Sequence, residues 1–248
     1  MFVRVWEGMV WRLFRLFLLI ATPVTGWAGD FSISPVHVHL SQQHKIAALV
    51  LTNLQDAPLT VQATAQAWSQ AHGRNITTDT DQLIISPPLF ELPPHGRQII
   101  RVGLRIPLPV DQEKDYRLIL HEVPPPPKPG FTGVQLVLRM ILPVFVAPVA
   151  NATHIQLKVS AHATEKGFSL QMVNEGNIHA EITGLRISEN DHTIFSKNIL
   201  VYVLPTSSQE VSIPITHGEA GIGKTLFVQI MTRQEEKPID ASVVVAAP

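Results

Sequence analysis

The most constraining feature of this sequence is an apolar alternation that runs from Val134 to Val146. Every even position in it is apolar, whereas the odd positions include Gln135, Arg139 and Pro143. Side chains of a β-strand point alternately to its two faces, so a period of two over this length predicts one long strand. Pro143 has no N–H to donate to a neighbour, which places at least that part of the strand at a sheet edge. Long apolar edges promote aggregation unless a partner covers them.

Similar alternating segments, separated by turns, fill the rest of the chain, and no stretch of it has a convincing helical period. Before residue 148 they are 31–40, 46–52, 59–68, 83–86, 89–92, 98–104 and 116–123. After a linker-like stretch at 149–152 they are 155–161, 167–174, 180–188, 199–204, 210–215, 226–231 and 242–245. This spacing is typical of immunoglobulin-like sandwiches. We therefore predict an all-β protein with an N-terminal immunoglobulin-like domain at 29–148 and a C-terminal β-sandwich domain at 149–248.

Two local features refine the prediction for the N-terminal domain. The alternation of residues 31–40 changes phase at Pro35, which predicts a bulge or a strand that switches partners at this point. Trp68 stands at the end of another predicted strand. A large aromatic side chain gains more from burial than most others, so we expect Trp68 to fill a core rather than to form a platform for a ligand.

The N-terminus has the pattern of a secretory signal. Arg4, Arg12 and Arg15 accompany a short apolar run at 13–21, and small residues follow up to Ala28. The run is too short for a membrane span, so we predict a signal peptide at 1–28 and a mature chain that starts at the next residue, Gly29. The alternative is a single-pass N-terminal anchor.

Composition excludes several classes of partner. Removing three arginines and one glutamate with the signal, from a chain of 19 basic and 20 acidic residues, leaves a net charge near −3. A slightly acidic protein of this kind is not expected to bind nucleic acid or an anionic membrane surface. The chain has no cysteine, so core burial alone, without disulfides, must hold the fold together.

One motif suggests nucleotide binding. Residues 218–225, GEAGIGKT, match the phosphate-loop spelling G-x-x-x-x-G-K-T. The phosphate-binding mechanism requires this loop to open a helix, but residues 226–231 are typical of a strand. We therefore predict a glycine-rich hairpin loop and no nucleotide binding.

Other residue patterns give no catalytic or metal site. His37 and His39 flank Val38, but the other histidines are scattered along the chain with no spacing that would complete a metal site. No pair of carboxylates, activated nucleophile, or base with an orienting partner can be assembled from the sequence. We expect no enzyme activity, no metal and no cofactor.

Several phrases together resemble the periplasmic pilus-assembly chaperones of the chaperone–usher family. They are FSISPVHVHL, LVLTN, AQAW, PPLFELPPHGRQIIRVGL, YRLILHEVPP and LRMILPVFVAP in the first domain, with a looser match in LQMVNEGNIHAEITGL of the second. The PVFV end of the last strand is most similar to non-classical, archaic-type members.

The resemblance implies a fold and a function. It implies two immunoglobulin-like domains in an L-shaped arrangement, and a non-catalytic, ATP-independent chaperone in the periplasm. Such a protein binds, folds and caps pilus or fimbrial subunits by donor-strand complementation and delivers them to an outer-membrane usher, as part of fimbrium biogenesis and cell wall organization. A homodimer in which two free copies cap each other's edge strands is a possibility that the sequence leaves open.

The resemblance also implies which residues bind the subunit. The donor residues would be Val134, Leu136, Leu138, Met140 and Leu142. With these on the open side, a period of two turns odd positions such as Val137 toward the core of the sandwich.

Many family members grip the terminal carboxylate of the subunit with an arginine in the first strand and a lysine near the end of the donor strand. His37 and Pro143 stand at these two places. The nearest replacement is Arg139, on the same face as Pro143, with His37 as a weaker helper. The alternative is that both are solvated strand residues.

A second function is compatible with a chain of sandwich domains, namely that of a structural fimbrial subunit or adhesin. Such subunits usually lack one strand and carry an N-terminal donor peptide. This chain offers a full set of predicted strands in both domains, which favours the chaperone.

Overall fold

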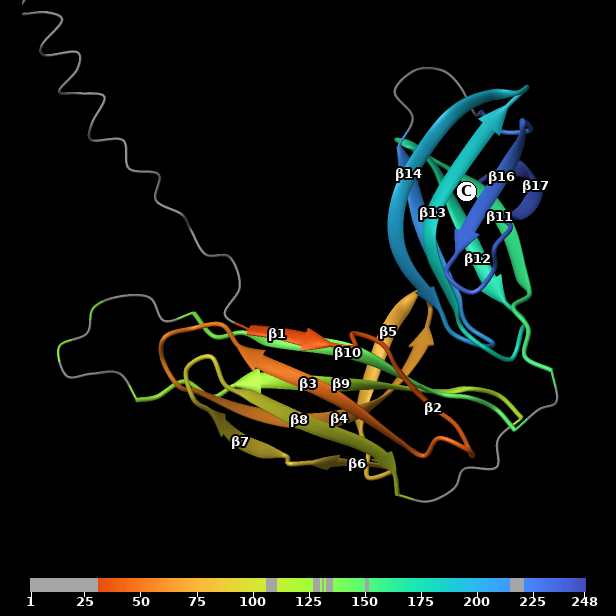
Figure 1. Cartoon of the computed structure of the whole chain (residues 1–248). Helices are drawn as coiled ribbons and strands as arrows, with labels where there is room; N and C mark the ends of the chain where they lie inside the picture. Colours follow the sequence, from red (N-terminus) through yellow and green to blue (C-terminus); the bar gives the residue numbers. More distant parts are fainter. Residues whose placement is uncertain are drawn as a thin grey trace, which may run out of the picture. The chain divides into compact units, whose positions relative to one another are not determined.

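The computed structural model describes residues 31–105, 111–126, 130, 132, 136–149, 152–214 and 221–248. Seventeen β-strands form the fold (Figure 1), and no helix occurs in this part of the chain. Accordingly, none of the described residues belongs to a helix long and apolar enough to cross a membrane. The predicted signal peptide at 1–28, the predicted mature start at Gly29 and the donor candidate Val134 lie outside the described residues.

Two sheets pack face to face in the first sandwich. One sheet has the order β1 (Phe31–Ser34), β3 (Ile46–Asn53), β8 (Arg97–Leu104) and β6 (Leu83–Ser86). The other has the order β2 (Val38–Leu40), β10 (Arg139–Val146), β9 (Lys114–Glu122), β4 (Leu59–Ala71) and β5 (Arg74–Asp79), with β7 (Leu89–Leu92) paired to β4. Alternate residues of both sheets form one buried core that includes Leu49, Ile100, Leu118 and Val144. The apolar residues of the alternating pattern are therefore those on the inward face of each strand.

The N-terminal segment switches between the two sheets, as the phase change at Pro35 predicted. β1 pairs antiparallel with β3 in one sheet. β2 pairs parallel with the end of β10 in the other. Pro35 lies between the two strands, where the chain needs no ladder hydrogen bond from its nitrogen.

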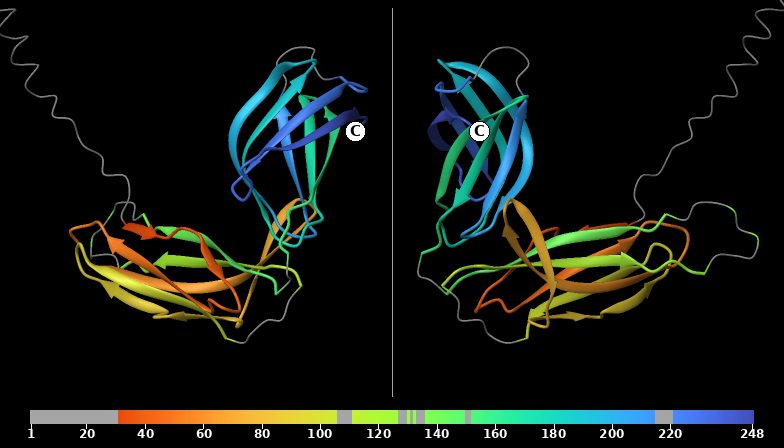
Figure 2. Two further views of the ribbon diagram at one scale, coloured as in Figure 1. Left: turned by 45° about the vertical axis from the view of Figure 1, so that its right-hand side comes forward. Right: turned by 180° about the vertical axis from the view of Figure 1, so that it is seen from behind.

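The second sandwich is built from a seven-stranded sheet around a core of its own. Its order is β14 (His192–Val203), β13 (Ala180–Glu189), β16 (Thr225–Thr232), β17 (Ile239–Ala246), β11 (Leu157–Thr164), β12 (Gly167–Asn174) and β15 (Ser208–Pro214). Phe168, Leu185 and Val228 are among its fully buried residues. Figure 2 shows the strands of each sandwich from two further sides. The proposed domain boundary between residues 148 and 149 falls between these two cores.

The strand at the centre of the sequence pattern is shorter than predicted. β10 starts at Arg139 instead of Val134, and residues 136–138 are not in a strand. The reason lies in its partner β9, which ends at Glu122 and is followed by prolines that have no N–H for a ladder. The Glu122 backbone N–H donates to the Leu138 carbonyl at 3.0 Å, and this is the end of the regular pairing.

The glycine-rich motif leads into a strand, as predicted. β16 begins at Thr225, and the ammonium of Lys224 forms an ion pair with Glu189 at 2.8 Å. A phosphate-binding lysine must instead be free to reach the ligand at a helix N-terminus. Gly218 lies outside the described residues.

Candidate functional site

The first half of β10 is an open sheet edge. On one side, β9 pairs with the whole strand, from Arg139 opposite His121 to Val146 opposite Lys114. On the other side, β2 pairs only with residues 144–146. No other strand in the described chain pairs with residues 139–143 on that side. The backbone groups there are available for another chain.

An apolar row on the even positions runs from the core out to this open edge. Val144 and Leu142 are buried in the core, and Met140 and Leu138 are partly buried against it. Leu136 continues the row in solvent, with 83% of its surface exposed. Because Leu142 is only 4% exposed and packs in its own sandwich, we remove it from the predicted donor set.

The expectation for the odd positions is wrong. Val137 and Ile141 are exposed, at 41% and 47%, and do not face the core. The phase of the strand is set by Val144 and Val146, whose side chains fill the core. A period of two then turns every odd position to the outer face.

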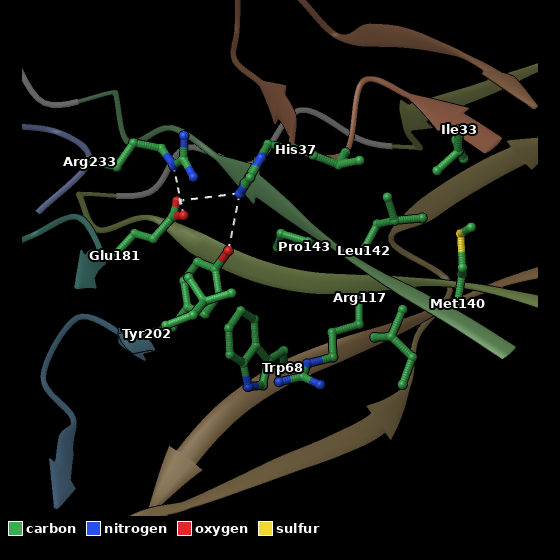
Figure 3. A pocket seen from close by; sticks show the side chains of 13 residues that line it. Ile33, His37, Trp68, Arg117, Met140, Leu142, Pro143, Glu181, Tyr202 and Arg233 are labelled. Atoms are coloured by element: carbon green, nitrogen blue, oxygen red, sulfur yellow. Dashed lines mark hydrogen bonds and ion pairs between the residues drawn. The ribbon is translucent and has the colours of Figure 1, made fainter. Parts of the chain in front are cut away.

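A cavity of about 530 Å³ lies beside the open edge. Figure 3 shows side chains from both sandwiches pointing into it. Its walls are formed by Ile33, Val36, His37, Trp68, Arg117, Met140, Ile141, Leu142, Pro143, Glu181, Leu200, Tyr202 and Arg233. Aliphatic side chains and cationic groups thus share one concave surface.

At one end of the cavity, a buried glutamate organises the polar groups. Glu181 is 1% exposed, and one of its oxygens accepts a hydrogen bond of 2.7 Å from Arg233 Nε. His37 Nε2 lies 3.4 Å from its other oxygen and 3.1 Å from the hydroxyl of Tyr202. Burial, together with the charge of Glu181, raises the pKa of Tyr202 to about 12, so this hydroxyl stays protonated. His37 and Arg233 therefore already have partners.

Arg117 is the cation of the cavity that has no acidic partner. Its guanidinium lies 4.2 Å from the ring centroid of Trp68, a cation–π geometry. None of the ion pairs among the described residues involves it. Burial lowers the pKa of Arg117, but a guanidinium titrates so high that it keeps its charge at neutral pH. It is suited to bind an anionic group.

The two predicted anchor residues are not brought together. His37 lines the cavity, whereas Arg139 is exposed at the start of β10 and does not. Sequence reasoning missed Arg117, although it lies directly opposite Pro143 in the β9–β10 register. The usable signal was the segment Tyr116–Glu122, whose alternation turns Arg117 away from the core.

Trp68 is buried, as predicted, but it packs between the two sandwiches. It is 5% exposed and forms a cluster with Phe145 and Leu204, against which Tyr202 packs. Phe145 also stacks on the imidazole of His179, with ring centroids 3.6 Å apart. These aromatic contacts connect β10 to the second sandwich.

Comparisons with known proteins agree with this geometry. Residues 30–152 match the family model described as the pili and flagellar-assembly chaperone, PapD N-terminal domain. No protein of curated function matches the sequence.

Several solved structures share the fold. One is a chain of the CsuC-CsuE chaperone–tip adhesion subunit pre-assembly complex, from archaic chaperone-usher Csu pili of Acinetobacter baumannii. It is 19% identical with a TM-score of 0.66, and the match covers 89% of this chain and 100% of that one. A chain of the Salmonella enterica SafA pilin–SafB chaperone complex is 19% identical with a TM-score of 0.60, and the match covers 89% of this chain and 98% of that one. The YadV chaperone is 18% identical with a TM-score of 0.61, and the match covers 86% of this chain and 100% of that one.

At these identities the structures demonstrate the fold, an all-β pair of immunoglobulin-like sandwiches. The family match covers residues 30–152, which carry the open edge, and this part of the chain belongs to the family of pili and flagellar-assembly chaperones, PapD N-terminal domain.

Proposed function

We propose that the mature protein acts in the periplasm, after removal of residues 1–28, as an ATP-independent chaperone that caps pilus subunits by donor-strand complementation and delivers them to an outer-membrane usher. The observation that carries this proposal is the open edge of β10 at residues 139–143 together with the apolar row that leads out of the core to Leu136. An incomplete sandwich in a subunit needs such a strand, because its own core lacks one.

The donor residues in this proposal are Leu136, Leu138 and Met140, with Val134 as a fourth. The backbone of β10 supplies hydrogen bonds of the kind that any added strand makes, and alternate side chains fill pockets of the subunit. Full burial of an aliphatic side chain of this size contributes about 1.5–3 kcal/mol. Leu138 and Met140 already bury part of their surface, so Leu136 gains the most when a subunit binds.

The same proposal places the terminal carboxylate of the subunit in the adjacent cavity. Arg117 is the main cation, because it has no carboxylate partner in the described chain and stacks on Trp68. His37 lines the same cavity and acts as a helper, although Glu181 and Tyr202 already contact it. Arg139 lies outside the lining and remains a proposed contact to the subunit near the start of the strand.

An open edge can also pair with a second copy of itself. We include in the proposal a homodimer that caps its own edge strands when no subunit is present and that dissociates when a subunit binds. This pairing would protect the free chaperone against the aggregation to which apolar edges are prone.

Co-expression of the chain with exported candidate subunits, followed by purification and mass measurement, tests the function. A one-to-one complex that forms and persists without ATP is the expected result. Polymers of the chain itself would refute the proposal and would favour a structural fimbrial subunit instead.

A further inference from the structure

Three metal-ligating side chains come together away from the cavity. Glu113 immediately precedes β9, Asp115 lies in β9, and His179 immediately precedes β13 in the second sandwich. One ligand atom from each of them lies within 4.8 Å of the other two. Glu113 and His179 are only 7% and 4% exposed. His179 is 66 residues from Glu113 in the sequence, which is why no spacing motif predicted a site.

The cluster has an acidic atom without a partner. Glu113 Oε1 accepts hydrogen bonds from the His179 backbone N–H at 2.8 Å and from its ring Nδ1 at 2.6 Å. Asp115 Oδ1 is shielded from solvent, yet it forms no hydrogen bond in the described part of the chain. A buried carboxylate oxygen in this state is costly unless a proton or a cation compensates it.

We propose that Glu113, Asp115 and His179 bind a divalent transition-metal ion, with Zn²⁺ the best match. One imidazole nitrogen and two carboxylate oxygens are typical ligands of zinc, whereas Ca²⁺ and Mg²⁺ favour oxygen alone. An ion of charge +2 neutralises both carboxylates. A fourth position would go to water or to the second oxygen of Asp115.

The surroundings of His179 hold its ring for this role. The ring stacks on Phe145, and its Nε2 lies 2.9 Å from Nε2 of Gln234. Gln234 is itself fixed, because its Oε1 accepts a hydrogen bond of 3.1 Å from the Glu181 backbone N–H and its Nε2 donates one of 3.3 Å to the His179 carbonyl. These contacts hold the imidazole in one position beside the two carboxylates.

The proposed ion would cross-link the two sandwiches, because two ligands come from the first and one from the second. This goes beyond subunit capture and does not depend on it. The cavity residues and the open edge of β10 contribute no ligand, so each proposal can fail without the other.

Calorimetric titration of ZnCl₂ into untagged, chelator-treated mature protein tests the site. We expect one equivalent to bind with micromolar or tighter affinity, and Asp115→Asn to weaken binding by at least about tenfold, since it removes a charged ligand at constant volume. The matched control is His95→Asn, which disrupts an exposed His95–Asp56 contact of 2.9 Å and should leave the titration unchanged. Absence of stoichiometric binding, or equal binding by wild type and Asp115→Asn, would overturn the proposal.

Two further measurements keep the test valid if the variant is poorly folded. Zn²⁺ at about 100 times its dissociation constant should raise the Tm of the wild type by at least about 5 °C. Cobalt(II) bound to the wild type should show the intense visible bands of a four- or five-coordinate site. A spectrum identical to that of hydrated cobalt(II) would contradict a built site.

Discussion

Replacing Leu136 by lysine should separate folding from subunit capture. Leu136 is 83% exposed, so only about a sixth of its surface contributes to the stability of the free chain. At about 1.5–3 kcal/mol for full burial of a leucine, the change costs about 0.3–0.5 kcal/mol. For a chain of this size that is a decrease in Tm of about 1–2 °C.

The effect on binding should be much larger. If Leu136 enters a pocket of the subunit, lysine forfeits the remaining burial, about 1.2–2.5 kcal/mol, and brings a charge into an apolar groove at further cost. Each 1.4 kcal/mol is a factor of about ten in affinity. We therefore expect capture to weaken by about tenfold to a hundredfold or more.

Two neighbouring positions provide matched controls. Val137→Lys changes an exposed residue of the opposite face, so it should keep both the fold and most of the subunit capture. Leu142→Lys places a charge in the core and should unfold the first sandwich, at a cost of several kcal/mol. Thermal unfolding reports on folding, and the yield of co-purified subunit reports on capture. The reasoning is refuted if Leu136→Lys captures subunit as well as the wild type, or if Val137→Lys loses as much as Leu136→Lys.

Other predictions concern the cavity, the glycine-rich loop and the N-terminus. Arg117→Ala should reduce the yield of co-purified subunit more than Arg139→Ala or His37→Ala does, while the Tm changes little. A larger loss of yield from Arg139→Ala would show that Arg139, and not Arg117, binds the terminal carboxylate of the subunit. ATP and GTP should show no saturable micromolar binding, because Lys224 is paired with Glu189 and enters a strand; binding that disappears in Lys224→Ala would contradict this. Intact-mass measurement of the exported protein should give a chain that starts at Gly29, whereas retention of residues 1–28 in the membrane fraction would favour an anchor.

Local patterns in the sequence predicted most strands of the fold. The alternation in residues 139–146 and the phase change at Pro35 are properties of neighbouring residues, so they survive whatever the strands pack against. β5 was missed because all residues of Arg74–Asp79 are exposed and all but Ile76 are polar. A strand without a buried face leaves no alternation to detect. The start of β10 was predicted too early for the opposite reason, since the apolar pattern of the sequence persists beyond the end of its partner β9.

The open sheet edge could be predicted from sequence, because an apolar alternation interrupted by Pro143 on one strand contradicts a fully paired sheet. Which of its side chains are free could not be found in this way. Val144 and Val146 are core residues only because β10 lies between β2 and β9, and this assigns Leu142 to the core and Leu136 to solvent.

The polar sites depended entirely on tertiary structure. Arg117 lies opposite Pro143 on the neighbouring strand, and Glu181 contacts His37 from the other sandwich. His179 contacts Glu113, which is 66 residues away in the sequence. A sequence determines the apolar period of a strand and the positions of turns and prolines, which depend on a few neighbouring residues. A site requires residues distant in the sequence to lie close together in space, and only the packing of the sheets brings this about. The chain by itself therefore determined an all-β protein with an apolar edge strand. The tertiary structure decided which side chains of that strand are buried and which cations lie beside its open edge.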